Sequence, residues 1–175
     1  MRHTLCTIAW IVGIVGGLAG FDAVAGEVPT TQSTPLALLS GADSKVSEAS
    51  YRRVTSADQW KRVWLDHLGL EDDDIYRPVF DVDFQRCMVL AVFRGKMDNI
   101  ASQRVDSVTE TERAIVVRIA HVGYQTIGGW KHVTPFVFIV LPKSGKRIVL
   151  EDNVQTYMAH PPEWKELARI EAVGP

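Results

Sequence analysis

The run Cys87–Phe93 constrains the fold of this chain more than any other segment. Its residues, CMVLAVF, are apolar at every position. Side chains alternate between the two faces of a β-sheet, so such a strand has no face suited to water. The run therefore predicts a strand in the middle of a sheet, covered on at least one side by a helix. Gly95 marks its end.

The strongest helix signal lies upstream of this strand. Ser56 followed by Gln59 forms a capping box, which favours a helix start. Gly69 is typical of the residue just past a helix end. Between them, apolar residues and one histidine recur at the spacing of a single helix face. These residues are Trp60, Val63, Trp64, His67 and Leu68.

Further strands and one short helix are expected downstream. Alternating apolar residues predict strands over 103–109, 114–121, 130–141 and 147–150. Glu110–Arg113 and Lys143–Lys146 are predicted to form hairpin turns. Pro135 lacks a backbone donor, so it marks an edge position or a bulge within the long strand. Pro162 favours a short helix over 163–169.

This order of elements predicts an α+β fold. We expect a single small domain over residues 51–175, a mostly antiparallel sheet of about five strands with an N-terminal helix packed on one face. Past the first 25 residues, Cys87 is the sole cysteine, so the domain folds without a disulfide. A buried, inert Cys87 thiol is the simpler interpretation, and a reactive cysteine is the alternative.

The N-terminus has the features of a secretory signal. Arg2 is positive, Leu5–Phe21 is a mostly apolar stretch, and Ala23-Val24-Ala25 places small residues at a cleavage site before Gly26. Residues 1–25 therefore predict export and an extracytoplasmic location, periplasmic or secreted. An uncleaved membrane anchor is the alternative. Residues 26–50, rich in Pro, Thr, Ser, Ala and Gly, predict a flexible linker.

Charge and motifs argue against several classes of function. A formal net charge of -2 gives no basic face for nucleic acid. The histidines lack zinc-site spacing, and Asp72–Asp74 lacks the glycine and terminal glutamate of a calcium loop, so we expect no metal and no cofactor. A Gly-x-Ser-x-Gly elbow and a suggestive carboxylate pair are both missing. We therefore assign no catalytic residue.

One cluster of polar and aromatic residues is a candidate binding site. It surrounds Gly128-Gly129, between two expected strands. Tyr and Trp suit recognition surfaces because they bury much area at low entropic cost. The alternative is that these aromatics simply cover one end of the sheet. The candidate partner-binding residues are His121, Tyr124, Gln125, Trp130 and His132.

Several local features also occur together in one known family. They are the helix start Ser56–Trp60, the Asp83-Phe84 pair, Val89–Phe93 followed by Gly95, and Thr134-Pro135-Phe136. Through them, residues 51–152 resemble the PrcB C-terminal family, named after an accessory subunit of a bacterial surface protease complex. Members commonly carry a Pro-Thr-Gly-Gly-Tyr-like segment after the strand, whereas here Gly95–Ala101 keeps only its first glycine. The resemblance implies an exported, non-catalytic domain that associates with other proteins at the cell envelope.

Together these features predict an exported interaction module with a protein partner in the cell envelope. We expect no nucleic-acid partner, and membrane contact only through the export signal before cleavage. The rival hypothesis is a small-ligand binder or hydrolase-type enzyme with a site near His121, Tyr124 and His132. A pocket with converging polar groups would favour the rival, and a flat surface would favour the module.

Overall fold

The computed structural model describes residues 31–33, 35–71, 81–123, 129–155 and 160–173. Within them, one helix and eleven strands follow each other along the chain. They are β1 (Thr31–Ser33), β2 (Ala37–Gly41), β3 (Ala49–Val54), α1 (Ala57–Leu68), β4 (Cys87–Arg94), β5 (Met97–Asp98), β6 (Ile100–Glu110), β7 (Ala114–Gly123), β8 (His132–Val133), β9 (Phe136–Pro142), β10 (Arg147–Asn153) and β11 (Trp164–Ile170).

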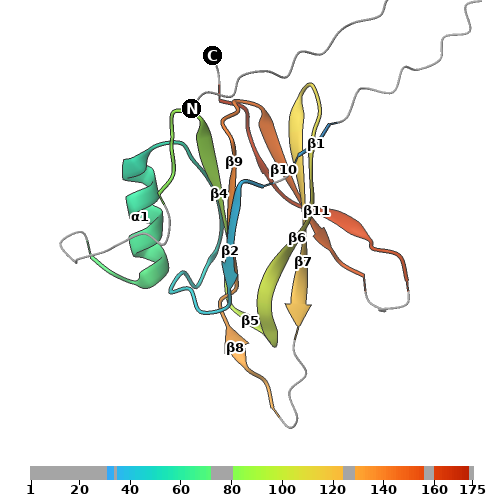
Figure 1. Ribbon diagram of the computed structural model, residues 1–175. Helices are drawn as coiled ribbons and strands as arrows, with labels where there is room; N and C mark the ends of the chain where they lie inside the picture. Colours follow the sequence, from blue (N-terminus) through green and yellow to red (C-terminus); the bar gives the residue numbers. More distant parts are fainter. Residues whose placement is uncertain (1–30, 34, 72–80, 124–128, 156–159, 174–175) are drawn as a thin grey trace, which may run out of the picture.

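The strands form three sheets in place of the expected single sheet of about five. A four-stranded sheet has the order β2-β9-β4-β3, and a five-stranded sheet has the order β1-β6-β7-β10-β11. A short two-stranded sheet pairs β5 with β8. Helix α1 covers the four-stranded sheet on the side away from the five-stranded one (Figure 1). The domain is α+β and mostly antiparallel, as predicted, with β10 beside β7 as a parallel pair.

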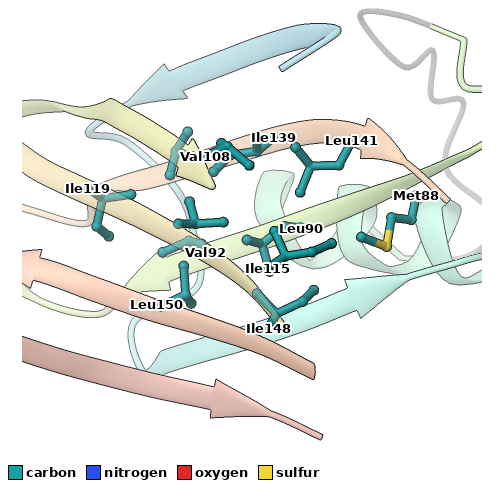
Figure 2. Packing of buried hydrophobic residues seen from close by; sticks show 12 residues of the cluster. Met88, Leu90, Val92, Val108, Ile115, Ile119, Ile139, Leu141, Ile148 and Leu150 are labelled. Atoms are coloured by element: carbon teal, nitrogen blue, oxygen red, sulfur yellow. The ribbon is translucent and has the colours of Figure 1, made fainter. Parts of the chain in front are cut away.

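Strand β4 explains why the domain has two cores. Met88, Leu90 and Val92 pack between the two large sheets (Figure 2). The alternate residues Val89, Ala91 and Phe93 pack toward α1. The apolar run thus lies between a helix and a second sheet, and the prediction of a central, covered strand is confirmed.

The ends of α1 are confirmed as predicted. The Ser56 hydroxyl accepts a hydrogen bond from the backbone N–H of Gln59 at 3.3 Å. The Gln59 side-chain oxygen accepts one from the backbone N–H of Thr55 at 2.8 Å, one residue before the cap. Gly69 has a φ of 67°, the left-handed conformation that favours glycine.

The buried face of α1 differs from the prediction at one position. Trp60, Val63, Trp64 and His67 are buried, as expected. Leu68, the last residue of the helix, is 38% exposed, and Leu65 is buried in its place.

The predicted flexible linker over residues 26–50 is too long. Residues 31–33 and 37–41 form β1 and β2, and β3 begins at Ala49. Leu38 of β2 pairs with Ile139 of β9, far along the chain. A short strand whose partner is so distant has no local periodicity to reveal it, which is why composition suggested a linker.

Pro135 divides the long strand predicted over 130–141 into β8 and β9. Proline cannot donate to a ladder, but its carbonyl still accepts from the backbone N–H of Arg94 at 3.0 Å. The turn predicted at Lys143–Lys146 also differs, since it connects the two sheets and does not close a hairpin.

The short helix predicted over 163–169 is wrong. Residues Trp164–Ile170 form β11, antiparallel to β10. A helix of seven residues is marginal by itself. The open edge of β10 offers hydrogen bonds, and Leu167 and Ile170 gain burial against the core.

The predicted signal segment, residues 1–25, lies outside the described residues. Among the described residues, no helix is both long and apolar enough to cross a membrane.

Candidate functional site

The structure places three of the five candidate residues, and it separates His121 from Trp130 and His132. His121 lies in β7, His132 in β8, and Trp130 just before β8. Tyr124 and Gln125 lie outside the described residues. Among the described contacts, no hydrogen bond or ion pair joins His121 to His132.

His121 belongs to a polar cluster between the two large sheets. Alternate inward residues of β4, β7 and β10 are apolar until each row ends in a polar residue. The three residues at these ends are Arg94, His121 and Asp152. Because all three rows end at the same end of the sandwich, their side chains meet there.

The contacts in this inter-sheet cluster are specific. Arg94 Nη2 lies 2.7 Å from Asp152 Oδ2, and both side chains are only 9% exposed. His121 Nε2 lies 3.4 Å from the same carboxylate oxygen. His121 Nδ1 lies 2.9 Å from Gln103 Nε2. An amide N–H donating to Nδ1 places the imidazole proton on Nε2, facing Asp152.

Burial and hydrogen bonding act in opposite directions on Asp152. Burial raises the pKa of its carboxyl group, but hydrogen bonds from His121 and Arg94 lower it, and the net pKa is below its ordinary value. The carboxylate is therefore held ionised between two donors. Arg94 comes from the four-stranded sheet and Asp152 from the five-stranded sheet, so the pair ties the layers together.

A second feature opens at the same end of the domain, and we call it the basic groove. It is a hollow of about 450 Å³ formed by three separate segments. Its lining residues are Ala42, Asp43, Ser44, Lys45, Lys96, Lys131, His132, Val133 and Thr134.

Backbone hydrogen bonds hold the walls of the basic groove together. The N–H of Thr134 donates to the carbonyl of Ala42 at 3.0 Å, and the N–H of Ser44 donates to the carbonyl of Thr134 at 3.2 Å. The N–H of Lys45 donates to the carbonyl of His67 at 2.8 Å, which attaches this wall to the end of α1. The groove is thus preformed by main-chain contacts.

Positive charge gathers in the groove of a chain whose net charge is -2. Three lysines, Lys45, Lys96 and Lys131, line it against one carboxylate, that of Asp43. Lys45 and Lys96 form no ion pair with any described residue. His132 is engaged separately, with its Nδ1 2.6 Å from Asp98 Oδ1.

Trp130 directly precedes Lys131, which lines the groove. It is 77% exposed, the largest exposed fraction among the large hydrophobic residues of the described chain. Asn99 fixes the backbone at its base, since its N–H donates to the carbonyl of Lys131 at 2.9 Å. The Asn99 side-chain oxygen accepts from the N–H of Lys131, also at 2.9 Å.

His67 adjoins one wall of the groove, because its carbonyl accepts the hydrogen bond from the N–H of Lys45. Its side chain is buried, and its ring lies 4.1 Å from that of Phe136, centroid to centroid. Burial lowers the pKa of this imidazole, and the negative charge of Asp43 opposes the effect in part.

Sequence reasoning missed Lys45, Lys96, Arg94 and Asp152. A usable signal existed for the last two, because period two extends the inward rows of β4 and β10 to them. No comparable signal existed for the two lysines, which lie in loops that converge only in the folded chain.

In the described part of the chain, no three His, Cys, Asp or Glu side chains come close enough together to bind a metal ion. Comparisons with protein-family models, with curated proteins and with solved structures found no match. Within the described residues, we therefore take the inter-sheet cluster and the basic groove as the candidate sites.

Proposed function

We propose that this chain is an exported, non-catalytic protein-binding module of the cell envelope, and that its partner binds at the basic groove and Trp130. The observation that carries the proposal is the exposed Trp130, which directly precedes Lys131 in the lining of a preformed hollow. Tryptophan is enriched among the residues that dominate interface energies, where it becomes buried by the partner. Here Asn99 holds the adjoining backbone in place while the Trp130 side chain stays largely exposed.

The arrangement of the histidines favours this proposal over a small-ligand or hydrolase-type site. Such a site needs polar groups that converge on one reacting position. His121 is committed to Gln103 and Asp152 between the sheets, and His132 to Asp98 on the surface. Each already has its partner, and the two do not share one.

Export and the accessory role complete the proposal. Export is supported by the positive, apolar and small-residue pattern of residues 1–25. The accessory role is what the resemblance to the PrcB C-terminal family implies for a domain that binds other proteins.

The test is cross-linking capture of the partner by the exported protein in envelope extracts, followed by affinity measurement with the recovered, purified partner. Trp130→Ala should weaken that affinity about tenfold or more, at the scale of an interface hot spot, without changing the melting temperature. Leu36→Ala is the matched control, since Leu36 is also an exposed apolar residue but lies outside the groove. Unchanged affinity of Trp130→Ala would place the binding surface elsewhere.

A further inference from the structure

We infer that the basic groove binds an acidic segment of the partner protein, an extended peptide with at least two carboxylates and a neighbouring apolar residue. This inference rests on the proposed function and specifies the chemistry of its partner.

Three ammonium groups from separate parts of the chain line one hollow. Lys45 lies between β2 and β3, Lys96 between β4 and β5, and Lys131 just before β8. Scattered surface lysines are ordinary, but lysines brought together by three chain segments produce a local positive potential. The carboxylates at this site are Asp43 in the lining and Asp98, which contacts His132, so the lysines outnumber the carboxylates. A negatively charged partner segment would supply the missing charge.

The shape of the site favours a peptide over a membrane surface. The lysines line a hollow of about 450 Å³, which a flat array of lipid headgroups cannot enter but side chains can. Val133, Ala42 and Thr134 give the hollow apolar and weakly polar walls for the stems of glutamate side chains. Trp130 is largely exposed and directly precedes Lys131 of the lining, so an apolar neighbour of those glutamates would find a contact there.

Because the cations of the groove are lysines, they favour a partner whose carboxylates lie at separate positions. Each lysine ammonium is a compact charge with three donors on a flexible stem, so it adapts to carboxylates at different positions. The hydrogen-bonded walls hold the groove open before binding, which lowers the entropic cost of association.

Fluorescence anisotropy with synthetic peptides tests the inference on the full exported chain. The probe is a labelled ten-residue peptide of alternating glutamate and leucine, and its counterpart has glutamine in place of glutamate. We expect the glutamate peptide to bind about tenfold or more tightly than the glutamine peptide, and to weaken as salt rises.

Charge-reversing substitutions of the groove lysines test whether the glutamate peptide binds there. Lys45→Glu with Lys96→Glu should reduce affinity for the glutamate peptide about tenfold or more, and the milder pair Lys45→Gln with Lys96→Gln should reduce it less. The matched control, Arg113→Glu with Lys165→Glu, makes the same change in net charge at exposed positions outside the groove. Equal loss in the control would show a non-specific charge effect and overturn the inference.

Two other outcomes separate this inference from the function on which it rests. If the captured partner needs Trp130 but ignores charge reversal and salt, the module stands and the acidic segment is wrong. If vesicles containing anionic lipid bind through the three lysines and the glutamate peptide does not, the assignment to a peptide is wrong. If neither Trp130 nor the lysines affect the captured partner, both proposals fail.

Discussion

Arg94 and Asp152 join the two large sheets through a buried ion pair, with 2.7 Å between Arg94 Nη2 and Asp152 Oδ2. The pair closes one end of an otherwise apolar interface between the sheets. Removing one member leaves the other charge buried without its partner, which typically costs about 3–5 kcal/mol. We therefore expect Arg94→Ala and Asp152→Ala each to lower the free energy of unfolding by roughly that amount.

Urea denaturation measures this effect, and an exposed pair provides the control. Arg104 Nε and Asp106 Oδ1 are similarly close, at 2.6 Å, but the Arg104 side chain is 63% exposed. Arg104→Ala should cost less than about 1 kcal/mol, because solvent screens exposed pairs. Similar losses at the two sites would mean that the sheets do not depend on the buried pair.

His67 makes stability depend on pH. Burial lowers the pKa of His67 in the folded chain, whereas the imidazole has a pKa of about 6.5 in the unfolded chain. The unfolded state therefore binds more protons below that pH, so stability is greatest above it and falls as pH decreases. His67→Phe, placed among Phe93, Phe136 and Phe138, should flatten the dependence between about pH 7 and pH 5.

Thermal melts across this range measure the effect, with His160→Gln as a control at an exposed position. The control should keep the slope of the parent protein. The carboxyl of Asp152 affects stability over a lower pH range. Its folded pKa is depressed, so its contribution is complete above about pH 4 and is lost below it. A slope between pH 7 and 5 that survives in His67→Phe would assign the dependence to another group.

The two candidate histidines should differ in what they contribute to stability. His121→Ala removes a partner from both Gln103 and Asp152, and leaving buried polar groups unsatisfied costs about 1–3 kcal/mol. His132→Ala should change stability by less than about 0.5 kcal/mol, because its side chain is 86% exposed. Chemical denaturation of the two variants makes the comparison, and equal effects would contradict the inter-sheet cluster.

Local patterns predicted the elements that local forces define. The capping residues Ser56 and Gly69 bound α1, and the run at Cys87–Phe93 is the covered central strand. Strand pairing was beyond such patterns. β2 and β11 were not predicted as strands, since each is stabilised by a partner strand and not by its own sequence.

The candidate site shows the same division between local and tertiary information. Trp130 was found because an aromatic residue beside Gly128-Gly129 is conspicuous in sequence. Lys45 fell in a segment whose composition suggested a linker, and Lys96 in a turn judged only by its departure from a family motif. They become a site only because Thr134 and Lys45 bond to neighbouring segments and bring the walls together.

Gly95 links the fold to the groove, and its substitution is the sharpest local test. It has a φ of 70°, and a Cβ at this position would lie 2.9 Å from the backbone nitrogen of Ala49. Gly95→Ala should therefore cost about 1–3 kcal/mol in unfolding free energy, from backbone strain and from the displaced neighbour. Because Lys96 follows directly, the same shift should weaken binding of the glutamate peptide.

Gly129→Ala is the matched control, since a Cβ there meets nothing within 4 Å. It should alter stability by less than about 0.5 kcal/mol. A Gly95→Ala variant as stable as the parent would contradict the close backbone approach between β3 and the end of β4.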